Sequence, residues 1–219
     1  MDFEYSPKVN DLRERLIAFM DEHVYPIEEE RDHFLHDPAN LWVPWPGGDG
    51  IKEKARAAGL WNLFLPHEYT PWSPGLTNLE YAPLAEQMGR VLGASEYFNC
   101  AAPDTGNMEI LARYGTAEQH ERWLKPMLAG EIKSAYVMTE PEVASSDATN
   151  VATTIIADGD DYVINGRKWW ISGAMDPRCK VYILLGRTPN QDRPRHQQHT
   201  QCRCPPIARG SPSCVRCMC

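Results

Sequence analysis

The sequence predicts an α+β protein, with an N-terminal all-α helical domain, then an antiparallel β-barrel-like middle domain that is incomplete, and then a disordered tail. Apolar residues recur with helical spacing as far as about residue 130 and with strand-like spacing from about Ile132. Beyond residue 189 the chain contains no Leu, Phe, Trp or Tyr. Because the strands follow the helices instead of alternating with them, the α+β class is favoured. We expect domains at 1–132 and 133–189, and a tail at 190–219.

The first domain is expected to consist of amphipathic helices. In residues 7–31, seven apolar residues fall close to one face, with charged residues opposite: Leu12, Leu16, Ile17, Phe19, Met20, Val24 and Ile27. Thr116-Ala117-Glu118-Gln119 has the form of a capping box, in which the Thr and Gln side chains satisfy the first backbone N–H groups of a helix. Further helices are predicted at 51–58, 78–88 and 108–114, and the capped helix is expected to end at Gly130.

The second domain is expected to be an antiparallel β unit. Asp158-Gly159-Asp160-Asp161 predicts a turn between two strands, and Asn165-Gly166 is a strong signal for a tight turn. The strands are predicted at 134–139, 151–157, 162–166, 168–171 and 180–185.

The tail differs from both domains in composition. Residues 190–219 contain five Arg, no Lys and one Asp, a net charge of +4, and five of the seven cysteines. A segment with so little apolar surface cannot offset the ~1–2 kcal/mol per residue of ordering entropy, so we expect disorder. Translation out of frame is the interpretation that we favour for this segment. A natural disordered tail is an alternative. Another is a zinc-binding tail that uses Cys202-Arg203-Cys204 and Cys214-Val215-Arg216-Cys217-Met218-Cys219.

Composition excludes some classes of function. The formal net charge of -8 argues against a nucleic-acid partner, because phosphate contacts need clustered Lys and Arg. No apolar run approaches the roughly 20 residues that a membrane span needs. The first residues have no basic segment followed by an apolar one, so no secretory signal is expected, and a cytoplasmic location is predicted.

Four passages are similar, in order and spacing, to the acyl-CoA dehydrogenase family. They are Ala55–Trp61 continuing to Leu65–Tyr69, Gly115–Gln119 with Leu124–Glu131, Ala135–Pro141 with Ser145–Asp147, and Asn165–Gly173. The third resembles the flavin-binding signature of the family and the fourth the strand that follows it. The chain departs from the signature at Glu142, Val143 and Ala144, where glycines are usual, and has Ser-Ser-Asp in place of Gly-Ser-Asp.

The resemblance implies FAD as cofactor and an acyl-CoA thioester as substrate. Family likeness places the flavin against Tyr136, Met138, Thr139, Trp170, Ile171 and Ser172. Ser145 is the equivalent of the signature serine when counted from Thr139. It would contact both the cofactor and the acyl-CoA, with Ser146 as the alternative at the substrate. The family further implies fatty acid metabolism, an electron-transfer flavoprotein or a similar acceptor, and a homo-oligomeric full-length parent.

The catalytic base of the family lies in a second helical domain, and we expect this chain to end before it. None of Glu131, Glu140 or Glu142 matches that base by motif, so no catalytic residue is assigned. A truncated form of this kind is expected to retain FAD weakly or not at all and to show no turnover. Two other hypotheses remain open. One is a flavin-dependent monooxygenase or nitroalkane oxidase on the same fold, and the other is a non-enzymatic interaction fragment.

Overall fold

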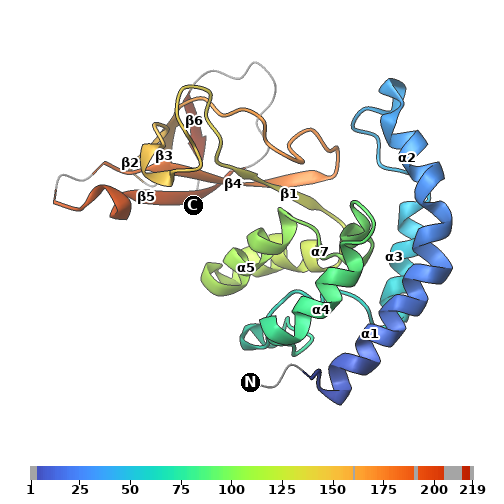
Figure 1. Cartoon of the computed structure of the whole chain (residues 1–219). Coiled ribbons are helices and arrows are strands. Elements are labelled where there is room, and N and C mark those ends of the chain that lie inside the picture. Colours follow the sequence, from blue (N-terminus) through green and yellow to red (C-terminus); the bar gives the residue numbers. More distant parts are fainter. Residues whose placement is uncertain (1–3, 160, 190–191, 205–213, 218–219) are drawn as a thin grey trace. The chain divides into compact units, whose positions relative to one another are not determined.

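The computed structural model describes residues 4–159, 161–189, 192–204 and 214–217. The chain divides into two compact units, residues 1–130 and 131–219 (Figure 1). The first consists of helices and the second is built on a sheet, which confirms the predicted α+β class. No described helix combines the length and the apolar character that crossing a membrane would require.

The helical unit begins with a longer helical run than the sequence predicted. Helix α1 (Pro7–Phe19) is capped by Ser6, whose Oγ accepts a hydrogen bond from the Val9 N–H, at 3.3 Å. A π-helical turn (Met20–Val24) and a 3-10 turn (Tyr25–Ile27) then lead into α2 (Glu28–His36). Five of the seven residues of the predicted apolar stripe are buried, and Ile17 and Ile27 are half-buried. The buried ones are Leu12, Leu16, Phe19, Met20 and Val24.

This unit also contains the helices α3 (Gly48–Ala57), α4 (Asn78–Met88), α5 (Asp104–Tyr114), α6 (Ala117–Gln119) and α7 (Lys125–Leu128), and 3-10 turns at Pro38–Asn40, His67–Tyr69 and Ala94–Phe98. The predicted capping box is confirmed, since Thr116 and Gln119 bond each other's backbone N–H groups. A π-helical segment (His120–Leu124) joins α6 to α7, and the chain leaves the helix at Gly130 with φ +69°.

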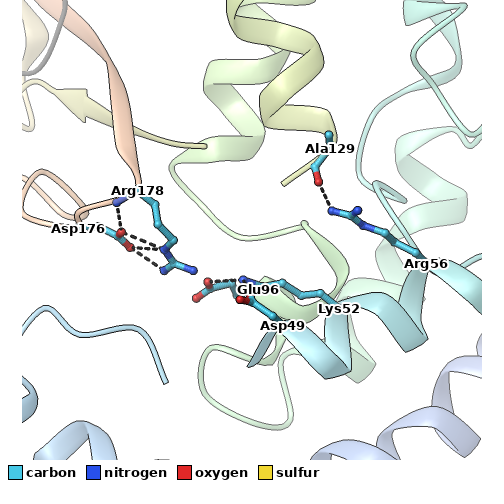
Figure 2. Close-up of polar contacts among 7 residues, drawn as sticks. All are labelled: Asp49, Lys52, Arg56, Glu96, Ala129, Asp176 and Arg178. Carbon is cyan, nitrogen blue, oxygen red and sulfur yellow. Dashed lines mark hydrogen bonds and ion pairs between the residues drawn. The ribbon is translucent and has the colours of Figure 1, made fainter. Parts of the chain in front are cut away.

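The last carbonyl groups of α7 are satisfied by side chains from distant parts of the helical unit. The Leu128 carbonyl accepts hydrogen bonds from Trp61 Nε1 at 2.8 Å and Asn62 Nδ2 at 3.0 Å. Asn99 Nδ2 bonds the Met127 carbonyl at 2.9 Å. The Arg56 guanidinium bonds the Ala129 carbonyl, as Figure 2 shows. These bonds supply partners that the helix itself cannot provide at its end, and so fix where the helical unit stops.

The β unit contains six strands: β1 (Lys133–Val137), β2 (Thr154–Asp158), β3 (Asp161–Asn165), β4 (Cys179–Arg187), β5 (His199–Cys204) and β6 (Cys214–Cys217). The sheet order is β1-β4-β2-β3-β6, with β5 pairing β4. Both β1 and β2 run parallel to β4, so the sheet is mixed and open, and the antiparallel prediction is wrong for these two pairs. The central strand β4 is buried throughout Val181–Leu185, and β1 pairs with it at Cys179–Leu184 and β2 at Arg187. More than a dozen residues separate β1 and β2 from β4 along the chain, which is enough for a crossover that returns in the same direction.

Two local predictions in this unit are wrong. Residues 168–171 form no strand, because Trp170 adopts a left-handed backbone with φ +52° that interrupts an extended chain. The β2–β3 hairpin closes through Gly159, at φ +63°, as the Asp158–Asp161 turn predicted. The predicted tight turn at Asn165-Gly166 is not formed, and Gly166 instead follows the end of β3 and lies beside Thr153. A Cβ on Gly166 would lie 2.2 Å from Thr153 Oγ1, so close approach and not a tight turn requires this glycine.

The predicted disorder of the tail is wrong for its described parts. Arg195–Gln197 forms a 3-10 turn, and both β5 and β6 are strands, paired with β4 and β3 respectively. The physical reason is that Cys202 and Cys204 act as small apolar side chains, 1% and 0% exposed, within the core of the β unit. The remaining tail predictions at 190–191, 205–213 and 218–219 lie outside the described residues.

Three cysteines of the β unit whose side chains the structure describes are buried: Cys179, Cys202 and Cys204. In the part of the chain that the structure describes, no three His, Cys, Asp or Glu side chains are grouped to hold a metal ion.

Candidate functional site

A hollow of about 580 Å³ opens on the surface of the β unit. Its walls come from the loop after β1 and from the irregular segment between β3 and β4. The lining residues are Met138, Thr139, Glu140, Pro141, Val143, Ser145, Ser146, Trp169 and Trp170. We call this hollow the groove. It brings together five of the residues that the sequence singled out: Met138, Thr139, Ser145, Ser146 and Trp170.

One wall of the groove is an exposed pair of tryptophans. Trp169 is 46% exposed and Trp170 is 80% exposed, and their rings meet edge to face with centroids 5.8 Å apart. A left-handed backbone at a bulky residue such as Trp170 is an outlier that the surrounding structure must impose. The Trp169 N–H donates to the Thr139 carbonyl at 3.1 Å, which holds the pair against the opposite wall. The groove therefore offers a flat aromatic surface to a ligand.

The opposite wall is a loop shaped by Ser145. Its hydroxyl accepts a hydrogen bond from the Glu140 N–H at 2.8 Å and donates to the Val143 carbonyl at 3.3 Å. This serine therefore organises the loop from within, whereas Ser146 is an exposed residue of the same wall. Asp147 follows and caps the 3-10 turn Ala148–Asn150 through the Thr149 N–H, at 3.0 Å. The Thr149 hydroxyl and backbone hold the pKa of Asp147 below its ordinary value.

Glu140, a residue of the groove lining, forms a buried ion pair with Lys168 that the sequence analysis did not assign to the site. Lys168 Nζ donates to Glu140 Oε1 at 2.9 Å and to the Met138 carbonyl at 2.6 Å. The Glu140 carboxylate also accepts from the N–H groups of Ala152, at 2.7 Å, and Thr153, at 2.9 Å. The two side chains are 3% and 9% exposed for Glu140 and Lys168 respectively.

The electrostatics of this pair keep Glu140 ionised. Burial acts to raise the pKa of Glu140, but the hydrogen bonds from Thr153, Lys168 and Ala152 outweigh it and lower the pKa. Burial lowers the pKa of Lys168, and Glu140 partly opposes that change. Among the described residues that line the groove, Glu140 is the only carboxylate. Because its oxygens are already occupied by donors, it is poorly suited to remove a proton from a ligand.

Three predicted site residues lie away from the groove lining. The Tyr136 hydroxyl accepts a hydrogen bond from Gln201 Nε2 at 3.1 Å, and burial raises the pKa of this tyrosine. Ile171 packs against the apolar core of the β unit, and Ser172 is exposed. A strand through 168–171 would have placed alternate side chains on one face, but the left-handed Trp170 removes that alternation.

The sequence analysis did not identify Trp169 as part of the groove wall, nor the Glu140–Lys168 pair that supports this wall. All three residues stand in the quoted motifs, Thr139-Glu140-Pro141 and Arg167-Lys168-Trp169. A signal was available, because charged residues inside otherwise apolar motifs are expected to be paired when buried. The sequence could not show which opposite charge each would meet.

The helical unit has a smaller hollow of about 400 Å³, lined by Glu68, Tyr69, Thr70, Trp72, Ala112 and Arg113. The Trp72 ring in its wall packs edge to face against the His120 ring, with ring centroids 5.7 Å apart. Lys125 Nζ lies 5.9 Å from the Trp72 ring centroid. This lining mixes both signs of charge and, among the described residues, shows no arrangement that selects one class of ligand.

Two sequence profiles match the chain over most of its length. Residues 6–131 match "Acyl-CoA dehydrogenase, N-terminal domain", and residues 135–211 match "Acyl-CoA dehydrogenase, middle domain". The second match extends beyond residue 189, where the tail was expected to begin, and includes β5.

Individual relatives agree with the profiles. The chain is 56% identical over 203 residues to the Mycobacterium tuberculosis protein assigned as acyl-CoA dehydrogenase FadE2, covering 91% of this chain and 48% of that protein. It is 54% identical over 198 residues to mouse acyl-CoA dehydrogenase family member 10, covering 89% of this chain and 18% of that protein. A solved structure from Mycobacterium abscessus, assigned as an acyl-CoA dehydrogenase, is 50% identical with a TM-score of 0.84, covering 93% and 51% of the two chains. The chain thus spans about half or less of the length of these relatives.

Proposed function

Because the chain belongs to the acyl-CoA dehydrogenase family, we propose that it forms the N-terminal and middle portions of an FAD-dependent oxidoreductase acting on an acyl-CoA thioester. In this reaction a hydrogen leaves each of the α and β carbons of the acyl group. The single observation that carries the proposal is the exposed Trp169–Trp170 wall beside Met138 and Thr139. A large aromatic surface left in water is costly, and a flat ligand would cover it.

The residues of the groove suit a flavin in shape and chemistry. Trp170 and Met138 offer apolar contact to a ring system, and Thr139, Ser145 and Ser146 offer polar groups along the opposite wall. Bound there, the flavin would supply the acceptor for the hydride from the β carbon. The contribution of this chain is to hold the ring in place, shield one of its faces from water, and orient the acyl-CoA near Ser146.

The proton from the α carbon needs a base that is within reach and free to accept it. Glu140 is surrounded by Lys168 and two backbone donors, which supports leaving the catalytic base unassigned. We therefore expect no turnover from this chain alone. The remaining parts of the proposal follow from the family: an electron-transfer flavoprotein or similar acceptor, a role in fatty acid metabolism, and a homo-oligomeric full-length parent.

The test is a titration of the full chain with FAD, carried to concentrations high enough to detect the weak binding expected of this chain, and followed by flavin fluorescence. Stacking on Trp170 is expected to quench the flavin, and Trp170→Ala is expected to abolish the quenching. Trp42→Ala is the matched control, because Trp42 is also an exposed tryptophan (47%) with a left-handed backbone, but lies in the helical unit. Equal loss of quenching in both variants would contradict the proposed site.

Turnover is measured separately, with acyl-CoA and an electron-accepting dye, and oxygen consumption is recorded in parallel. Product formation by the chain alone would contradict the assignment of no base. Oxygen consumption with a nitroalkane and none with acyl-CoA would favour the oxidase chemistry instead.

A further inference from the structure

The Glu140–Lys168 pair joins three separate segments of the β unit. Glu140 belongs to the loop after β1, Ala152 and Thr153 directly precede β2, and Lys168 lies between β3 and β4. Lys168 donates to both the carbonyl of Met138 and the carboxylate of Glu140, and both of these residues line the groove. The N–H of Glu140 in turn donates to Ser145 Oγ. One buried pair therefore connects every wall of the groove.

Stability alone does not explain a pair of this kind. A buried ion pair is weak evidence for stability, because an apolar pair of similar volume is often as good or better. What a charged pair adds is direction, since its hydrogen bonds are made in one geometry only. Here the hydrogen bond from Lys168 holds the Met138 carbonyl, two residues before Glu140. Trp169, the residue after Lys168, bonds the Thr139 carbonyl, so the two segments are held together at adjacent positions.

We propose that Glu140 and Lys168 act as positioning residues, holding residues 138–145 against 167–170 so that the Trp169–Trp170 wall stands ready for the flavin. The proposal rests on the proposed flavin site for its purpose, but the positioning itself is a property of the free chain. Neither residue is expected to touch the reacting atoms.

The chain contains its own control pair. Glu142 and Arg167 form an ion pair between the same two segments, adjacent to the buried one. Their side chains are 58% and 73% exposed, so their interaction is screened by water. The double variant Glu142→Gln/Arg167→Gln removes this exposed pair. The double variant Glu140→Gln/Lys168→Met removes the buried pair without leaving a lone buried charge.

The first measurement is amide hydrogen exchange of the full chain without FAD. In the wild-type chain, the N–H groups of Ala152 and Thr153 lie outside a strand, yet are expected to exchange slowly because Glu140 accepts them. In Glu140→Gln/Lys168→Met, peptides covering 138–153 and 167–170 are expected to exchange at least about tenfold faster. In the control double variant they are expected to stay within about twofold of wild type. Rapid exchange of Ala152 and Thr153 in the wild-type chain would overturn the proposal, even if the buried-pair variant failed to fold.

The second measurement is FAD binding, with FAD itself as the probe. The buried-pair variant is expected to bind about tenfold more weakly than wild type while keeping its melting temperature within a few degrees. At saturating FAD, its visible circular dichroism is expected to differ from wild type, which a purely structural role would not produce. Wild-type affinity and spectrum in that variant would refute positioning. No FAD binding by the wild-type chain, with the exchange pattern as expected, would refute the flavin site and leave the positioning supported.

Discussion

Replacing Lys168 by Met would leave the Glu140 carboxylate buried without its cation. Met preserves most of the length and apolar contact of the lysine stem, so the change isolates the ammonium group. Glu140 would retain the N–H groups of Ala152 and Thr153 as donors. The variant therefore measures the cost of an uncompensated buried charge in a known hydrogen-bonding environment.

The magnitude follows from the burial of both partners. With side chains 3% and 9% exposed, the pair belongs with buried ion pairs, for which loss of one partner costs about 3–5 kcal/mol. The two remaining backbone donors favour the lower end, so we expect the free energy of unfolding to fall by about 3 kcal/mol. Arg167→Met breaks the neighbouring exposed pair and is expected to cost about 0–1 kcal/mol.

Urea denaturation of both variants at neutral pH, analysed with the wild-type slope, gives the two losses directly. Adding Glu140→Gln to Lys168→Met should recover about 1 kcal/mol or more, because it removes the charge that Met left unpaired. A Lys168→Met variant within about 1 kcal/mol of wild type would refute the reasoning, since the carboxylate would then be adequately stabilised without its cation.

Three further outcomes follow from the same structure. Folding lowers the pKa of Glu140, so its contribution to stability is complete above the ordinary value of 4.5 and is lost as the pH falls through the lower, folded value. The unfolding free energy, measured as a function of pH in the acid range, should show this loss in wild type and not in Glu140→Gln. Gly166→Ala should destabilise the chain by about 1–3 kcal/mol in urea, because its Cβ would meet Thr153. Gly106→Ala in α5, where a Cβ meets no atom within 4 Å, should instead stabilise it by about 0.5–1 kcal/mol, and the opposite ranking would contradict the close approach. Cys204→Ser should cost about 1–3 kcal/mol by placing a hydroxyl in the core of the β unit, whereas a melting temperature equal to wild type would mean that β5 is not part of the fold.

Local signals in the sequence predicted the helices well, because each depends on neighbouring residues. Thr116 and Gln119 form their capping box whatever the rest of the chain does, and the stripe at Leu12 and Leu16 needs only a surface to pack on. Strand direction is different, since the parallel pairing of β1 with β4 joins residues more than 40 positions apart. Periodicity carries no information about such a partner.

The tail shows a different limit of sequence reasoning. Because residues 190–219 contain no Leu, Phe, Trp or Tyr, they were predicted to be too polar to fold. The strand β5, however, needs only two small apolar side chains and a free edge of β4. Cys202 and Cys204 satisfy the first requirement, and the edge of β4 that does not pair with β1 provides the second. Neither the pairing nor the available edge can be read from the composition of the tail.

The sequence singled out five residues of the groove lining but not how the groove is built, and the reason lies at Trp170. A bulky residue with φ +52° stores strain of about 1–3 kcal/mol, and an 80% exposed indole adds the cost of apolar surface in water. Neither cost would persist unless neighbouring contacts fixed the backbone on both sides. The Trp169–Thr139 hydrogen bond and the Lys168 bonds to Met138 and Glu140 supply that constraint. The strained, exposed tryptophan wall is thus held in place by the buried Glu140–Lys168 pair. Holding that wall is in turn the physical reason for a buried pair that stability alone does not explain.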